Sequence, residues 1–287
     1  MSNCECDRLK KDLAHCFVEN NINTVQGNSI LKILATHNCF EKFPKDIRTL
    51  LNTPQAPITL IAIEPGEYVH IGLSKSLIEL LSSVCDVPLQ LILDISTDGA
   101  VADNCSTKSY WPIQIRVINL PNTLPIIIGL YLGKEKPSDS SKLFQCVTEE
   151  FEAIEKNGGI NFRNKLITVK FNCFIGDAPA RAYVLKHVGH TSYNACSKCK
   201  VLGQYSYRRM CFLGTNHCLR TNEEYNLRTD KKHHRPGESP LSVLKINPVS
   251  HVPFDYMHLV LLGVMKKLFH AWIEGKFSGF QKLNEQI

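Results

Sequence analysis

Two kinds of metal-binding chemistry lie close together in residues 171–200, FNCFIGDAPARAYVLKHVGHTSYNACSKCK. Asp177 follows an apolar run that ends at Ile175, and a Cys-x-x-Cys pair, Cys196 and Cys199, follows further along. Carboxylate oxygens are preferred ligands of hard ions such as Mg²⁺ and Mn²⁺, whereas thiolates are preferred ligands of Zn²⁺. One chain therefore carries the residue types of two different metal sites.

A second aspartate, Asp98, also ends an apolar stretch, 79 positions before Asp177. If the two stretches are neighbouring parallel strands, both carboxylates lie at the same edge of the sheet and repel one another. A divalent cation would neutralise them, and Mg²⁺ or Mn²⁺ held there would serve the cleavage or transfer of a phosphodiester. We therefore predict Asp98 and Asp177 as catalytic metal ligands, with Asp94 on the same strand face as the alternative to Asp98.

Each aspartate also has a purely structural interpretation. Asp98 precedes Gly99 and can open a turn, and Asp177 precedes a helical stretch and can cap it. The sequence leaves the structural and the catalytic interpretations open.

The Cys196 and Cys199 pair has the spacing of half a structural zinc site, which needs four ligands. Candidates for the other ligands are His190, Cys211, Cys218, Asp255 and His258. A redox pair of the thioredoxin kind is the alternative, but the strand-to-helix context of that motif is missing here. His258 alone would be interpreted as a core histidine, and the Cys-x-x-Cys pair in the same chain favours a metal ligand.

Alternating apolar and polar residues over 89–99 predict a strand that ends in a turn at Gly99. The further elements expected are, in order, strands at 110–120 and 124–134, a helix at 139–159, a strand at 165–175 and a helix at 178–188. Three antiparallel strands, a crossover helix and a fourth strand parallel to the first form a ribonuclease H-like α/β fold with a mixed sheet. No G-x-G-x-x-G or P-loop sequence is present, which argues against a nucleotide-binding enzyme.

The chain divides into three expected regions: a helical N-terminal segment at 1–55, the first part of the ribonuclease H-like core at 56–188, and a basic zinc-binding insertion with a following helix at 189–287. In the first region, helices are predicted to begin near Asp7 and after Asn28 as cap, with a third within 45–52. In the last region, residues 255–273 predict an amphipathic helix. The residues expected on or near its apolar face are His258, Leu261, Leu262, Met265, Leu268 and Phe269.

Charge is concentrated in one part of the chain. The formal net charge is +6, but residues 181–245 alone carry twelve lysines or arginines against four aspartates or glutamates. A basic stretch of this kind suits a polyanion such as DNA or forms a solvated loop. The longest apolar run, Leu124 to Leu132, is too short to span a membrane, and the N-terminus lacks a secretory signal, so we expect an intracellular protein. Most of the twelve cysteines are scattered singly, which favours free thiols over a disulfide framework.

Three blocks of the sequence resemble, in the same order, those of CACTA-type (En/Spm-like) DDE transposases and related transposase-domain proteins. They are DGAVADNCSTKSYWPIQIRV, GDAPARAYVLKHVGHTSYNACSKCKVLG and FDYMHLVLLGVMKKL. The resemblance extends over nearly the whole chain. It implies a ribonuclease H-like core in which Asp98 and Asp177 bind Mg²⁺ or Mn²⁺. It also implies a zinc-binding insertion whose Cys-x-x-Cys and Asp-x-x-His elements are Cys196, Cys199, Asp255 and His258.

The resemblance further implies DNA at transposon ends as partner, a homo-oligomer, and a nuclear location in a eukaryotic cell. The chain departs from the family at its third acidic residue, a glutamate on a helix well beyond the Asp-x-x-His block. Glu274 comes too early to match it, and the sequence stops at Ile287. We therefore expect an incomplete or degraded copy in which strand transfer is impaired. The alternatives are a catalytically inactive DNA- or protein-binding module and a zinc-stabilised scaffold.

Overall fold

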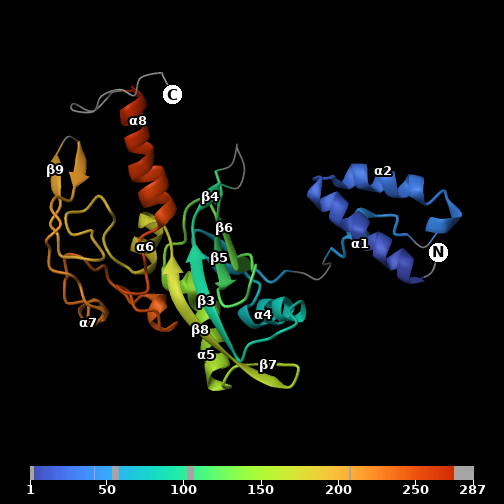
Figure 1. Ribbon diagram of the computed structural model, residues 1–287, viewed down its shortest axis with the longest axis horizontal. Coiled ribbons are helices and arrows are strands. Elements are labelled where there is room, and N and C mark those ends of the chain that lie inside the picture. Colours follow the sequence, from blue (N-terminus) through green and yellow to red (C-terminus); the bar gives the residue numbers. More distant parts are fainter. Residues whose placement is uncertain (1–2, 42, 54–57, 102–106, 207, 275–287) are drawn as a thin grey trace. The chain divides into compact units, whose positions relative to one another are not determined.

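The computed structural model describes residues 3–41, 43–53, 58–101, 107–206 and 208–274, and the chain divides into two compact units, Met1–Ile58 and Thr59–Ile287 (Figure 1). The predicted boundary between residues 55 and 56 lies outside the described residues. Among the described helices, none combines the length and apolar character that a membrane-spanning segment requires.

The first unit is helical, as expected from its sequence. Its elements are α1 (Asn3–Glu19), α2 (Thr24–Leu34), η1 (Asn38–Phe40) and α3 (Ile47–Leu50). They enclose a small core of Cys6, Phe17, Leu31, Phe43, Ile47 and Leu50.

Two helix starts predicted in this unit are wrong. The first helix begins at Asn3 instead of near Asp7. The second is capped by Asn23, whose side chain accepts a hydrogen bond from the Gln26 amide while the Gln26 side chain accepts one from the Asn23 amide. This reciprocal capping box makes Asn23 the stronger start signal. Asn28 instead accepts a hydrogen bond from the Ile47 amide at 2.7 Å and so ties α2 to α3.

The second unit is an α/β unit built on a mixed sheet (Figure 1). Its strands are β1 (Ile61–Ile63), β2 (Gly66–His70), β3 (Gln90–Thr97), β4 (Ala100–Val101), β5 (Ser109–Val117), β6 (Ile126–Gly133), β7 (Ile160–Phe162) and β8 (Lys165–Ile175). The strand order is β1-β2-β6-β5-β3-β8-β7, with β4 paired to β5. Among the strands of the described residues, β3 and β8 are the only parallel pair.

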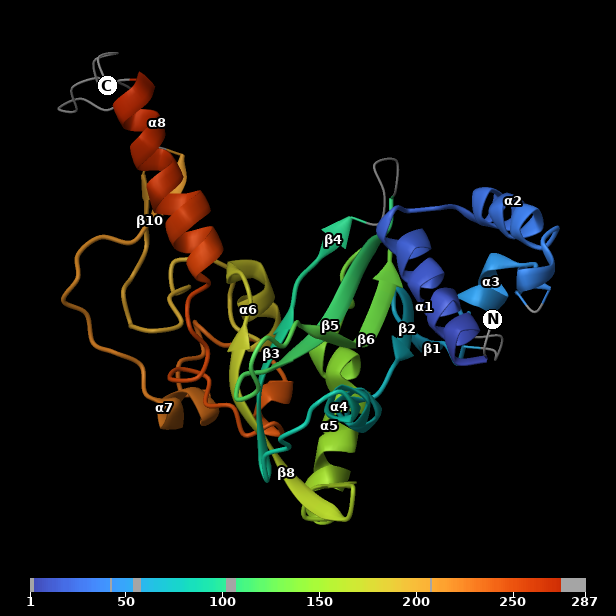
Figure 2. The ribbon, with the colours of Figure 1, turned by 45° about the vertical axis from the view of Figure 1, so that its right-hand side comes forward.

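The four predicted strands and their pairing are confirmed. β3, β5 and β6 form an antiparallel meander, and β8 returns beside β3 after the helix α5 (Ser140–Lys156). A further helix, α4 (Leu73–Ser82), packs with α5 against the sheet (Figure 2), and α6 (Ala178–Val184) follows β8. Alternate residues of β3, namely Leu91, Leu93 and Ile95, are fully buried beneath α5 side chains such as Phe144. Asp98 and Asp177 follow the two strands at the centre of this framework.

The residues after α6 contain little regular structure. The irregular segment, residues 185–256, holds the hairpin β9 (Gln204–Ser206) and β10 (Arg209–Cys211), the short helix α7 (Asn222–Asn226) and the turn η2 (Pro240–Ser242). Its apolar residues Tyr225, Leu241, Leu244, Ile246 and Val252 join the core of the sheet. The segment therefore packs on the α/β unit although it adds no strand to the main sheet.

The helix predicted over residues 255–273 is present in two parts. Met257–Met265 (η3) is π-helical, and Lys266–Glu274 (α8) is α-helical. The expectation of one amphipathic helix is wrong for the first part. A π-helix has hydrogen bonds between residues i and i+5, so apolar residues spaced for an α-helix do not share one face there. Leu259, Leu261, Leu262 and Val264 are exposed there.

Candidate active site

Asp98 and Asp177 occupy equivalent places after neighbouring parallel strands. The last paired residues of β3 and β8 are Ser96 and Ile175, and each aspartate lies two residues beyond its member of that pair. A bulge between Leu93 and Asp94 creates this match, because it shifts the pairing by one residue. Without it, the two side chains would differ by one position and face opposite sides of the sheet.

Several charges act on Asp98, and that of Asp177 is one of them. Burial raises the pKa of Asp98, and the negative charges of Asp177 and Asp255 raise it further. A hydrogen bond from the Gly99 amide and the charge of His258 act in the opposite direction. The aspartates predicted as one site are therefore electrostatic neighbours, and a third carboxylate, Asp255, adds to the same negative potential.

Both structural roles that the sequence left open are present. Asp98 Oδ1 accepts a hydrogen bond from the Gly99 amide at 2.8 Å, and Asp177 Oδ1 accepts one from the Ala180 amide at 2.7 Å as the N-cap of α6. These bonds fix the direction of each carboxylate and engage one oxygen atom of each. They are compatible with a metal ligand role, since a carboxylate has two oxygens with several lone pairs.

Asp94, the alternative first ligand, is engaged with the bulge. Its Oδ1 accepts hydrogen bonds from Asn172 Nδ2 at 2.7 Å and from Cys173 Sγ at 3.0 Å. Burial, together with this bond to a carboxylate, raises the pKa of Cys173 to about 12. Asp94 therefore stabilises the bulge that aligns Asp98 with Asp177.

The Asp-x-x-His element lies at the aspartate pair. His258 Nδ1 is hydrogen-bonded to Asp255 Oδ2, and this bond raises the pKa of His258. The charges of Asp177 and Asp98 also raise it, so the imidazolium form of His258 is favoured beside the carboxylates. Burial alone would raise the pKa of Asp255, but the bonds from His258 and from the Met257 amide lower it overall.

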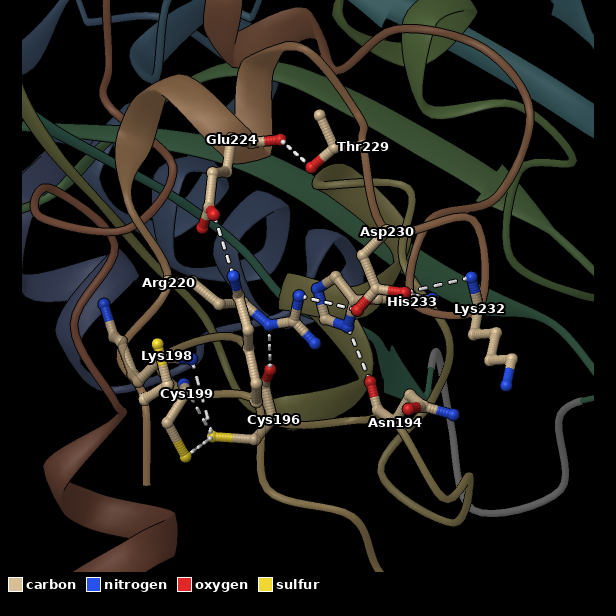
Figure 3. Close-up of polar contacts among 12 residues, drawn as sticks. Asn194, Cys196, Lys198, Cys199, Arg220, Glu224, Thr229, Asp230, Lys232 and His233 are labelled. Atoms are coloured by element: carbon tan, nitrogen blue, oxygen red, sulfur yellow. Dashed lines mark hydrogen bonds and ion pairs between the residues drawn. The ribbon is translucent and has the colours of Figure 1, made fainter. Parts of the chain in front are cut away.

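Cys196 and Cys199 lie on one tight turn, and their sulfur atoms face each other (Figure 3). The Sγ atoms of Cys196 and Cys199 lie 3.4 Å apart, and the amides of Lys198 and Cys199 both donate to Cys196 Sγ at 3.4 Å. Two hydrogen bonds join this turn to a second strand-like stretch, from Lys200 to the Cys218 carbonyl and from the Arg220 amide to the Lys198 carbonyl. The pair therefore fits half of a tetrahedral zinc site.

The predicted zinc ligands are only partly brought together. One cavity is lined by Cys196, Asp255, His258 and His190. Within this group, Asp255 and His258 are hydrogen-bonded to each other. Within the residues that the structure describes, no three histidine, cysteine, aspartate or glutamate side chains are grouped closely enough to hold a metal ion. Cys211 donates to backbone carbonyls, and Cys218 is exposed. Zinc ligation by Cys196, Cys199, Asp255 and His258 stays a prediction.

Sequence reasoning missed two residues beside the aspartates. Arg181 lies on α6, four residues after Asp177, and its guanidinium carbon is 4.7 Å from the centre of the Phe254 ring. Burial lowers the pKa of Arg181, while the charges of Asp177 and Asp255 act to raise it. The spacing from Asp177 is a readable signal, because residues i and i+4 share one helix face. Phe254 had no such signal.

The scan against protein-family models finds none that matches the chain, and no curated protein matches it either.

Proposed function

We propose that this chain is a transposase-like protein of the DDE type with a ribonuclease H-like core, whose ancestral reaction is metal-dependent cleavage and transfer of DNA strands. The alignment of Asp98 and Asp177 beyond one bulged parallel strand pair carries this proposal. The order β6-β5-β3-β8, parallel only at its last pair, supports the ribonuclease H-like interpretation.

The residues around the pair fit a hard divalent cation. Asp98 and Asp177 would hold Mg²⁺ or Mn²⁺, which activates the attacking oxygen and stabilises the leaving oxygen of a phosphodiester. Burial, and to a smaller extent the charges of Asp177 and Asp255, raise the pKa of Asp98, and a bound cation would stabilise its ionised form. Asp255 supplies a further negative charge, and His258 donates a hydrogen bond to Asp255 that orients it.

Structural Zn²⁺ at Cys196 and Cys199, with Asp255 and His258, belongs to the same proposal, as do DNA at transposon ends, a homo-oligomer and a nuclear location. The basic stretch of residues 181–245 supports a DNA partner, because lysine and arginine contacts to phosphates supply sequence-independent affinity.

The test is a nicking assay on supercoiled plasmid in Mn²⁺, with the 287-residue chain and, in parallel, any longer product of its reading frame. We expect nicked circles with the longer product and none with its Asp177→Asn variant, whereas nicking by the 287-residue chain should be impaired. Asp86→Asn, at an exposed aspartate in the loop before β3, is the matched control, and it should retain nicking. Equal nicking by Asp177→Asn and the parent would refute the catalytic assignment.

The charge of residues 181–245 also favours a second candidate, a DNA-binding module without catalysis. It predicts affinity for duplex DNA that falls steeply with salt and survives the double substitution Asp98→Asn and Asp177→Asn. DNA binding that ignores salt would count against this candidate.

A further inference from the structure

The cavity lined by Cys196, Asp255 and His258 has a volume of about 400 Å³. Arg181, Phe254 and His190 form other parts of its wall. This volume falls in the range of about 300 to 1,000 Å³ that is typical of small-ligand sites. Ala178, the residue after Asp177, also lines the cavity, so the cavity lies beside that predicted catalytic carboxylate.

Arg181 is a buried cation with unused hydrogen-bonding capacity. The residue is 9% exposed, and its Nη1 donates to the Gly176 carbonyl at 3.3 Å. Its Nε is buried and has no hydrogen-bond partner among the described residues. A buried donor without a partner is costly, and a guanidinium pairs well with the oxygens of a phosphate. Arg181 therefore gives the cavity wall a cationic side chain suited to an anionic group.

Phe254 supplies a flat surface next to that anchor. Its ring is partly exposed and has Arg181 on it at 4.7 Å and the Lys198 ammonium group at 5.8 Å from the ring centre. Lys198 is fixed by hydrogen bonds to the carbonyls of Val249 and Val252. Aromatic rings flanked by cations bind nucleobases by stacking, and they tolerate every base because each has a π face.

We propose that the part of this cavity walled by Arg181 and Phe254 binds one nucleotide of a DNA strand, beside the predicted zinc ligands, with its base against Phe254 and its phosphate at Arg181. The adjoining phosphodiester then lies at Asp98 and Asp177. This inference rests on the proposed function, because the nucleotide belongs to the strand that those carboxylates act on.

The test measures binding without added Mg²⁺ or Mn²⁺ and without chelator, which separates the cavity from metal-dependent chemistry and leaves any structural zinc in place. The probe is a fluorescein-labelled oligothymidylate of about 12 nucleotides, compared by anisotropy with an abasic oligomer of the same length. The parent should prefer the thymidylate, and Phe254→Leu should lose this preference with a drop in affinity of about tenfold. Arg181→Lys keeps the charge but loses the planar fork, so it should weaken both probes alike.

The chain offers a matched control in a second arginine–phenylalanine stack. Arg163 lies 4.9 Å from the ring centre of Phe162 on β7, and Phe162→Leu should leave the affinity unchanged. No oligothymidylate binding by the parent, no preference over the abasic probe, or an equal loss in both leucine variants would overturn the inference. Binding that depends on Phe254 without any Mn²⁺-dependent nicking would refute the proposed function and leave the cavity assignment standing. Nicking that requires Asp177, together with binding that does not depend on Phe254, would refute the cavity assignment and leave the proposed function standing.

Discussion

The central sheet and the irregular segment, residues 185–256, are held together in different ways. The strands β3, β5, β6 and β8 bury alternate apolar side chains against α4 and α5. The irregular segment depends on polar contacts between distant residues, such as Arg220 with Asp230 at 2.8 Å and His233 with the Asn194 carbonyl at 2.6 Å. Apolar burial is insensitive to direction, whereas each polar contact must meet a specific partner.

The two regions also differ in how many buried polar side-chain atoms lack a hydrogen-bond partner. In the described part of the irregular segment, buried side-chain atoms without a hydrogen-bond partner occur on His187, Tyr225, His233, His234 and His251. The described residues of the four central strands contribute none. Because each such atom costs about 1 to 3 kcal/mol, we expect the irregular segment to open more readily than the sheet.

The largest expected effect sharpens the sheet side of this comparison. Leu93→Ala removes a fully buried side chain and should lower the free energy of unfolding by about 3 to 5 kcal/mol. Urea denaturation followed by circular dichroism measures the change. Leu213→Ala, in the irregular segment, removes a side chain that is 62% exposed. It should change the free energy of unfolding by less than about 0.5 kcal/mol. Equal losses would contradict the division of the unit into two kinds of region.

A smaller effect is expected from the irregular segment. Arg220→Met leaves Asp230 and the Cys196 carbonyl without their partner, which should cost about 2 to 3 kcal/mol. Hydrogen exchange should show faster opening of residues 185–256 and little change in β3 or β8. Lys245→Met breaks an exposed pair with Glu155 and should cost at most about 1 kcal/mol. Uniformly faster exchange in the sheet would show that the two regions unfold as one.

The smallest expected effect lies where the two regions meet. The folded state raises the pKa of Asp98, so ionised Asp98 is less favourable there than in the unfolded chain. The stability that protonated Asp98 contributes is therefore lost as the pH rises from the pKa of Asp98 in the unfolded chain, about 3.9, through its higher pKa in the folded state. Asp98→Asn should raise the melting temperature at pH 7 and have no such effect below about pH 4. Asp94→Asn should lower it, because Asp94 accepts bonds from Asn172 and Cys173. A stabilisation by Asp98→Asn that is the same at both pH values would contradict the electrostatic cause.

The sequence predicted those parts of the fold that repeat along the chain. β8 has the predicted bounds because its buried apolar residues alternate from Ile167 to Phe171, and the partner strands follow from the same period. The bulge at Asn172 has no such signal, although it aligns Asp98 with Asp177. In the site, the two aspartates were readable as residues that end apolar runs. The contact of Arg181 with Phe254 was not, because it joins residues of α6 and the irregular segment that no local pattern relates.

Manganese binding tests the central claim most directly. Titration of Mn²⁺ into the protein, followed by electron paramagnetic resonance, should give binding that Asp98→Asn and Asp177→Asn each weaken at least tenfold, while Asp86→Asn, at an exposed aspartate before β3, retains it. Binding that survives both substitutions, or that depends on Asp94 instead, would contradict a shared cation at the ends of β3 and β8.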